Sequence, residues 1–196
     1  MSVVPFYSHS KGSHTYMSNF HPSRYTVLIS ELCHPNIVGH QLDDTLVSEL
    51  LQAYGPEIVF HWSEQGFMFI KCLVFIEGKG NMVTLHQIAN ARSPAECKAL
   101  GRSVSEYKDA VWKKLRYNAM RFNLIAKFAQ NQNLKDKLLA TGDNILVEAS
   151  PTDCVWGVGL RENDPRIRNP KQWRGQNLLG KCLMEVRAEF IDSAQI

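Results

Sequence analysis

Two kinds of hydrophobic pattern alternate along the chain. Short runs of β-branched and aromatic residues predict strands, and apolar residues that recur every three or four positions predict amphipathic helices. Strands are predicted over residues 3–8, 24–33, 57–62 and 145–150. Helices are predicted over residues 43–54, 63–77, 93–101, 103–128, 134–140 and 177–191. With 196 residues, 44% of them hydrophobic, the chain is long enough for one well-buried core, so we expect a single domain over residues 1–196.

Capping signals mark where several of these helices begin. Ser93 opens a capping box, SPAE, with Pro94 in the first helical position, and Gly101 is placed to end that helix. A second box, SVSE at Ser103, predicts the start of a longer helix whose wide apolar face reaches Phe128. Such a face packs into a core, so we assign no chemistry to it.

The charge and the cysteine content narrow the function classes. The formal net charge is +3 and the isoelectric point is about 8.6, which favours anionic small molecules and is too mild to indicate a nucleic-acid-binding protein by itself. The five cysteines lack a CxxC pair and the histidines lack HExxH spacing, so neither a disulfide framework nor a metal site is predicted. The first residues, MSVVPFYSHSK, do not show a cationic start followed by an apolar run, and no stretch approaches the roughly 18 apolar residues of a membrane span. We expect an intracellular protein with no cofactor and no membrane partner.

The segment SPTDCVWG, residues 150–157, combines a carboxylate with a tryptophan and a glycine among turn-forming residues. Asp153 is therefore a candidate site residue. The alternative is that Ser150 is a helix N-cap, Pro151 the first helical residue and Asp153 the acid of a capping box. On that alternative Asp153 only holds the start of a helix. A second acid beside a tryptophan, Glu64, favours the site.

Glu64 lies in the predicted first turn of an apolar helix, where the positive end of the helix dipole favours an ionised carboxylate. Lys71 follows seven residues later, about two helical turns along, so the acid and the amine would line one wall roughly 10 Å apart. The alternative is that Glu64 satisfies the helix start and that Lys71 extends to solvent from an apolar helix.

Aromatic and glycine residues near these acids suggest a flat ligand, because indole and phenol rings stack on heterocycles with little loss of entropy. The candidates are Tyr7, Phe20, Trp62, Trp156 and Trp173. Tryptophans are also core residues, and we expect at least two of the four to have only that role. The chain contains neither a GxGxxG nor a Walker loop, which disfavours dinucleotide and nucleoside-triphosphate binding of those kinds.

Several motifs follow one another in a defined order along nearly the whole chain. They are FYS from Phe6, SNF from Ser18, WSE from Trp62 with a lysine seven residues after the glutamate, SPxxxKxLGR from Ser93, LLATGDxxLVEASPxDxxWGxG from Leu138 and WxGxNxLGxxLMxxR from Trp173. Together they resemble the YbiA-like NADAR family. The resemblance implies an α+β fold, a helix-rich single domain around a small mixed β-sheet. Members are N-glycosidases: some cleave phosphoribosylated pyrimidine intermediates of riboflavin biosynthesis, and others remove ADP-ribose from guanine bases, including guanine in DNA.

The resemblance also implies roles for particular residues. Glu64 and Asp153 would be the principal catalytic acids. The residues that would shape a ribosyl-phosphate pocket are Ser18, Asn19, Phe20, Trp156, Gly157 and Asn177. Many relatives carry a histidine and a tyrosine where this chain has Gln65 and Gly66, so recognition of the base is expected to differ there. The segment 24–57 is longer than in the most compact members and is either a lid or an elaborated edge.

The chemistry of a glycosidase suits these residues. Breaking a C1′–N bond builds positive charge on the ribose, which a fixed carboxylate stabilises, while a second acid moves a proton or activates water. Lys71 would neutralise a phosphate, or attack the ring-opened sugar aldehyde as a Schiff-base amine. Arg102, Lys171 and Arg174 are either further phosphate contacts or solvated surface charges.

Two other functions compete with catalysis. A non-catalytic module could bind ADP-ribose or NAD in the same pocket, although such a module has little need of two acids beside an anionic ligand. A nucleic-acid-binding module is disfavoured by the modest charge and the lack of a basic run. The expected partner is ADP-ribose or another ribosyl-phosphate small molecule, with ADP-ribosylated DNA as a further partner, in the cytoplasm or the nucleus.

Overall fold

The computed structural model describes residues 2–8 and 12–193. The chain forms two compact units. One unit consists of residues 1–21 and 131–196, and we call it the terminal unit. The other consists of residues 22–130, and we call it the central unit.

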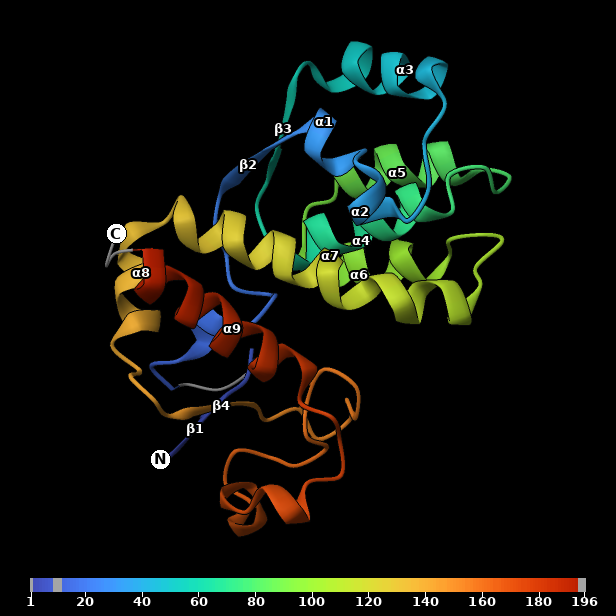
Figure 1. Cartoon of the computed structure of the whole chain (residues 1–196). Coiled ribbons are helices and arrows are strands. Elements are labelled where there is room, and N and C mark those ends of the chain that lie inside the picture. The colour runs from blue at the N-terminus through green and yellow to red at the C-terminus, as the bar shows by residue number, and fades with distance from the viewer. Residues whose placement is uncertain (1, 9–11, 194–196) are drawn as a thin grey trace. The chain divides into compact units, whose positions relative to one another are not determined.

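The terminal unit is built on two parallel strands that come from opposite ends of the sequence. β1 (Val3–Phe6) pairs with β4 (Ile145–Glu148), with Val3 opposite Ile145 (Figure 1). An apolar cluster of Val147, Ala149, Val158, Leu160 and Ile167 lies beside this pair. The helical elements of the unit are η1 (Thr15–Met17), α8 (Gln132–Leu139), η2 (Pro165–Arg168), η3 (Pro170–Gln172) and α9 (Leu178–Ser193).

The start of α9 is fixed against β4 by a close approach and by one side chain. A Cβ added at Gly180 would collide with the carbonyl oxygen of Leu146, so a glycine is required there. Asn177 donates from Nδ2 to the Leu146 carbonyl at 2.9 Å and accepts at Oδ1 from the Glu148 amide at 3.0 Å. The helix therefore begins at a fixed place beside the carboxyl end of the strand.

The central unit contains an antiparallel strand pair and most of the helices. β2 (Tyr25–Leu28) pairs with β3 (Glu57–Phe60), with Tyr25 opposite Phe60. The helices are α1 (Ile29–Leu32), α2 (Pro35–Val38), α3 (Asp44–Tyr54), α4 (Ser63–Val74), α5 (Asn81–Ala89), α6 (Pro94–Arg102) and α7 (Asp109–Ala129). α4 packs against α5, α6 and α7, and every one of its residues except Lys71 is buried.

Most predicted elements are confirmed, with boundaries shifted by a few residues. The exceptions have local causes. The strand predicted over 24–33 ends at Leu28, and α1 follows it, with the Ile29 amide donating to the Pro56 carbonyl at 2.9 Å. Residues 150–159 contain no helix, so the alternative of a helix start at Ser150 is wrong.

The prediction that a helix starts at the second capping box is also wrong. Ser103 does not open a helix, because its hydroxyl donates to the Leu100 carbonyl at 2.8 Å and so closes α6. The chain then passes through Glu106 in the left-handed region at φ 54°, and α7 begins at Asp109. α5 was not predicted, because the residue before it is Gly80, which has no side chain to cap a helix. The Asn81 side chain donates instead to the Ser105 carbonyl.

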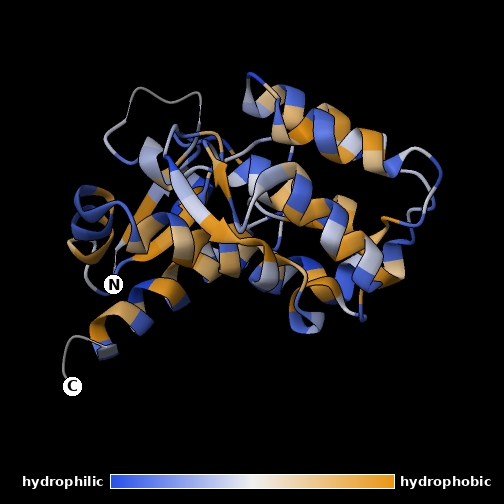
Figure 2. Cartoon of the chain, turned by 90° about the horizontal axis from the view of Figure 1, so that it is seen from above, coloured by the Kyte–Doolittle hydropathy of each residue, from blue (hydrophilic) through white to orange (hydrophobic). Residues whose placement is uncertain are grey.

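The α+β class is confirmed, and the described strands form one parallel and one antiparallel pair. Figure 2 shows polar and apolar residues alternating along the helical ribbons, as the spacing of the sequence predicts. Among residues 2–8 and 12–193, no helix is both long enough and apolar enough to cross a membrane.

Candidate active site

Glu64 lies in the first turn of α4, in the central unit. Its side chain is buried, with 6% of the residue surface exposed. Trp62 precedes the helix but makes no side-chain capping hydrogen bond, so the first turn has no cap from the N-cap residue. The Glu64 carboxylate lies in the first turn, at the positive end of the helix dipole.

The Gln65 side chain binds this end of α4 to backbone groups on either side of it. Gln65 is fully buried; its Oε1 accepts from the His61 amide at 2.9 Å and its Nε2 donates to the Ile88 and Ala89 carbonyls at 3.0 Å. Gln65 is thus engaged in the interior of the unit.

Gly66 is explained by a second buried contact. The Tyr25 hydroxyl donates to Asn123 Oδ1 at 2.8 Å, directly beside this glycine. A Cβ at Gly66 would collide with Asn123 Oδ1 and would lie 2.6 Å from the Tyr25 hydroxyl oxygen. The Tyr25–Asn123 pair therefore occupies the space that a larger residue at position 66 would need.

Lys71 lies on the part of α4 that faces α6. Its Nζ donates to the Gly101 carbonyl at 2.7 Å and lies 4.4 Å from the centroid of the Tyr107 ring. Burial lowers the pKa of Lys71, the charge of Cys72 raises it, and Arg102, which is itself exposed, lowers it further. The pKa of Cys97 on α6 is raised to about 12, first by burial and then by the charge of Glu64. Glu64 and Lys71 thus both lie toward α6. The Lys71 amine already has two partners, the Gly101 carbonyl of α6 and the Tyr107 ring.

Asp153 lies in the terminal unit, on the loop of residues 150–159. Its Oδ1 accepts from the Val155 and Trp156 amides, each at 2.8 Å. The capping alternative is therefore wrong: no helix starts at Ser150, and the carboxylate accepts from the two amides that follow it, which closes a turn. The residue is half-buried, and within the described residues no hydrogen bond engages Oδ2. One carboxylate oxygen is left for other chemistry.

The same loop is bound to the start of α9 through backbone groups. The amides of Asn177, Leu178 and Leu179 donate to the Gly157, Val155 and Trp156 carbonyls at 3.1, 3.2 and 3.1 Å. These are amides of the helix start, which need acceptors from outside the helix. The tryptophan-and-glycine cluster at 150–157 and the motif at 173–180 therefore build one structure, although the sequence presents them as separate motifs.

Two glycines let these segments approach. A Cβ at Gly175 would collide with the Gly157 carbonyl oxygen and would lie 2.7 Å from Cys154 Cα. A Cβ at Gly157 would lie 2.9 Å from the Asp153 carbonyl oxygen. Gly157 is thus required by the packing of the loop itself, and Asn177 is occupied by β4.

The SNF motif forms a compact turn after η1. Ser18 Oγ accepts from the Phe20 amide at 3.2 Å, and the Ser18 carbonyl accepts from the His21 amide at 3.2 Å. Asn19 is 7% exposed, and within the described residues its buried Oδ1 has no hydrogen-bond partner. An unsatisfied buried acceptor is costly, which makes Asn19 a candidate contact for a ligand hydroxyl or amine.

The aromatic candidates divide into two groups. Tyr7 and Trp173 pack against the apolar cluster of the terminal unit, and Trp173 Nε1 donates to the Ile167 carbonyl at 2.8 Å. These two side chains support the loop of residues 161–174. Trp62, Trp156 and Phe20 are half-buried and have exposed ring surface. They stay the candidates for stacking.

Glu148 and Lys127 are among the buried charged residues that the sequence did not single out. Glu148 ends β4 with 7% of its surface exposed, and its backbone carbonyl accepts from the Val158 amide of the Asp153 loop at 3.0 Å. Lys127 on α7 is fully buried, and burial lowers its pKa to about 7. Two features of the sequence could have indicated them: Glu148 directly follows the apolar run 145–147, and Lys127 lies within the apolar stripe of a predicted helix. Among the described residues no group of three histidine, cysteine, aspartate or glutamate side chains could hold a metal ion.

Comparisons with known proteins agree with the motif order. The NADAR domain model matches residues 5–191. Protein irg-1 of Caenorhabditis elegans is 36% identical over 175 residues, 88% of this chain and 74% of that protein. N-glycosidase R617 of Acanthamoeba polyphaga mimivirus is 36% identical over 127 residues, 65% of this chain and 72% of that protein. The NMR structure of the Escherichia coli protein YbiA superposes with a TM-score of 0.68 at 25% identity, covering 99% of this chain and 88% of that one. The chain belongs to the NADAR family.

Proposed function

We propose that the protein is an N-glycosidase that hydrolyses a C1′–N ribosyl bond. The observation that carries the proposal is Glu64, a buried carboxylate in a first helical turn that the N-cap side chain leaves uncapped. Membership of a family that includes a protein named N-glycosidase supports it. Because one family match spans residues 5–191, we treat both units as parts of a single functional domain.

The proposed chemistry divides the work between two carboxylates. Departure of the base leaves an oxocarbenium-like ribose, and a fixed negative charge lowers the energy of that state. Asp153 has one oxygen outside its turn, and Glu64 is held on a rigid helix. We assign these two acids to charge stabilisation and to proton transfer with water, without deciding which acid performs which step. Water adds its oxygen to C1′, one proton passes to a carboxylate, and the base leaves with a proton.

Lys71 is proposed as an electrostatic or covalent helper. Its lowered pKa and half-buried position are compatible with a Schiff-base amine, whereas its bond to the Gly101 carbonyl suits a fixed cation. Borohydride added during turnover would trap a ribosyl adduct on Lys71 only in the covalent case. Lys71→Arg keeps the charge and cannot form an imine, so an active arginine variant would exclude the covalent role.

The proposed substrates carry a ribosyl phosphate. We favour ADP-ribose attached to guanine, free or within DNA, with phosphoribosylated riboflavin intermediates as the second class. Asn19, with its unsatisfied buried oxygen, and the half-buried Trp156 are the proposed ligand contacts. We place the protein in the cytoplasm or the nucleus.

A panel assay tests the proposal and separates catalysis from binding alone. ADP-ribosyl-guanine in an oligonucleotide, the same adduct in a free nucleoside, and a phosphoribosylated pyrimidine are incubated with the protein, and release of base or ADP-ribose is measured. Release from at least one substrate, lost in Glu64→Gln, is the expected result. Thermal protection by ADP-ribose without any release would favour the non-catalytic module.

A further inference from the structure

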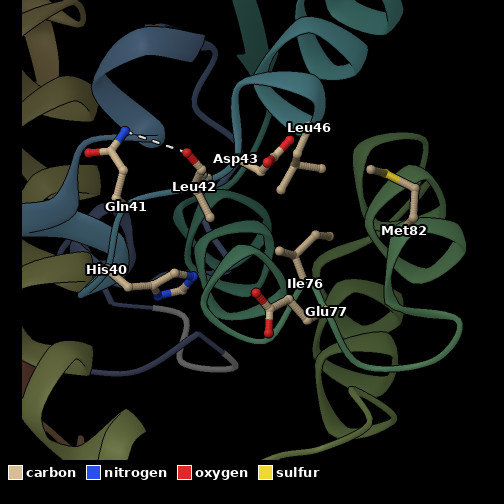
Figure 3. A pocket seen from close by; sticks show the side chains of 8 residues that line it. All are labelled: His40, Gln41, Leu42, Asp43, Leu46, Ile76, Glu77 and Met82. Carbon is tan, nitrogen blue, oxygen red and sulfur yellow. Dashed lines mark hydrogen bonds between the residues drawn. The ribbon is translucent and has the colours of Figure 1, made fainter.

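The central unit holds a cavity of about 210 Å³ at the end of α4 opposite to Glu64. Leu42, Leu46, Ile76 and Met82 supply its apolar walls, and Asp43 and Glu77 supply carboxylates (Figure 3). The connection between α2 and α3 provides one side. The turn after α4 and the start of α5 provide the other side.

The walls and the rim of the cavity differ in polarity. Leu42 and Ile76 are buried, with 3% and 8% of their surface exposed, whereas Leu46 and Met82 are half-buried. Asp43 and Glu77 are exposed. The cavity is therefore an apolar recess with acids where it reaches the solvent.

The polar side chains of the lining differ in their hydrogen bonds. The Gln41 amide donates to the Leu42 carbonyl at 3.5 Å, drawn as a dashed line in Figure 3, and His40 Nδ1 lies 3.2 Å from the Val38 carbonyl oxygen. Asp43 Oδ1 accepts from the Thr45 amide at 2.8 Å. Within the described residues no hydrogen bond or ion pair engages the Glu77 carboxylate. Asp43 has one oxygen engaged, so Glu77 is the acid of the lining with both oxygens available to a ligand.

The local electrostatics favour a cation. Among the described residues, no lysine or arginine lines the cavity, so an anionic nucleotide would meet two carboxylates there. The end of α4 at Val74 brings the negative end of a helix dipole nearby, and the starts of α3 and α5, beside Leu46 and Met82, bring positive ends, so the preference for a cation rests on the two carboxylates. The volume suits a ring of benzene size, since an apolar protein cavity of about 150 Å³ binds benzene.

We propose that this cavity binds a small primary amine with a compact apolar body, with the body against Leu42, Leu46, Ile76 and Met82 and the ammonium on Glu77. None of the described residues that line the cavity is assigned to glycosidase chemistry. It also gives part of the segment 24–57 a function, because residues 40–46 of that segment form one wall. Met82 suits such a wall, since an unbranched thioether adapts to ligands of different shape.

A binding experiment on the whole chain tests this proposal without any activity readout, so its result is independent of the proposed function. Benzylamine and benzyl alcohol are titrated separately into the 15N-labelled protein at pH 7. The two probes have nearly the same shape, and only the amine is charged. We expect benzylamine to shift the amide signals of residues 42–46 and 76–82 and to bind about tenfold more tightly than the alcohol, which corresponds to about 1.4 kcal/mol.

Matched variants locate the charge and the recess. Glu77→Gln should remove the tenfold preference, while Glu49→Gln, at an exposed position on α3 outside the lining, should keep it. Leu46→Trp should fill the recess and abolish binding of both probes, whereas Leu51→Trp, at a residue 42% exposed on the same helix, should not. Spectra of each free variant verify folding. Equal affinity for the two probes, absence of binding, or a preference that survives Glu77→Gln would each overturn the proposal.

Discussion

The two proposed catalytic acids are held in different ways. Glu64 lies on a buried helix whose start is fixed by side chains, through Gln65 and through the Tyr25–Asn123 pair next to Gly66. Asp153 lies on a loop fixed by backbone groups, through the carbonyls that accept from the start of α9. A side-chain support can yield by rotating about its bonds, whereas a backbone support yields only if the chain moves. The two regions should therefore respond differently to equivalent substitutions.

The largest expected effect is on catalysis, where the two regions should behave alike. Glu64→Gln and Asp153→Asn should each lower kcat by about 100-fold or more, because each removes a charge or a proton-transfer group and keeps the shape. Kinetics on the active substrate of the panel, with thermal melts in parallel, measure this. Asparagine at 153 keeps the Oδ1 acceptor, so the melting temperature should stay near that of the wild type. A wild-type rate in either variant would remove that acid from the mechanism.

The second prediction concerns stability and separates the two kinds of support. Gly175→Ala should destabilise the protein by about 3 kcal/mol or more, because its Cβ meets the backbone of Gly157 and Cys154. Gly66→Ala should cost about 1–3 kcal/mol, because its Cβ meets the side chains of Asn123 and Tyr25, which can shift. Urea unfolding gives both values. A larger loss at Gly66 than at Gly175 would contradict the distinction between side-chain and backbone support.

The third prediction uses Lys127, four residues beyond Asn123 on α7. Its pKa is lowered by burial from 10.5 to about 7 in the folded protein. Between these values the unfolded chain binds a proton that the folded protein does not, so this residue makes the free energy of unfolding rise with pH from about 7 to 10.5, by up to about 1.4 kcal/mol per pH unit. Below pH 7 both states are protonated and its contribution is constant.

Lys127→Met should remove that rise. Urea unfolding of the wild type and the variant at pH 7, 8 and 9 gives the difference between their free energies of unfolding, which should change steadily with pH. Lys135→Met, at a partly exposed residue of α8 whose amine lies 4.5 Å from the Phe190 ring centroid, is the control and should show no such trend. A constant difference for Lys127→Met would mean that the amine stays charged in the folded protein.

The smallest predicted effect is on the turn at Asp153. Asp153→Ala leaves the Val155 and Trp156 amides without their acceptor and should cost about 1 kcal/mol, or about 2–4 °C in Tm. Its kcat should fall at least as far as that of Asp153→Asn. If alanine and asparagine had the same Tm, the two hydrogen bonds would contribute nothing to the stability of the loop.

The candidate site could be predicted in part from the sequence. The first-turn position of Glu64 follows from the apolar spacing after Trp62, and the turn-forming residues around Asp153 announced a loop. The partners of Gln65, Gly66 and Lys71 could not be predicted, because Ala89, Asn123 and Gly101 are more than twenty residues away in sequence. Hydrogen-bond partners at such separations leave no local pattern.

The sequence by itself determined the type and approximate extent of most elements, because amphipathic spacing and caps act within one or two helical turns. It also determined family membership through the order of its motifs. The tertiary structure decided how ambiguous residues are used. Ser103 could cap the end of one helix or the start of the next. It closes α6, because its hydroxyl donates to the Leu100 carbonyl. Asp153 satisfies two amides of a loop that α9 holds in place, and only that packing prevents the helix that its local sequence permits.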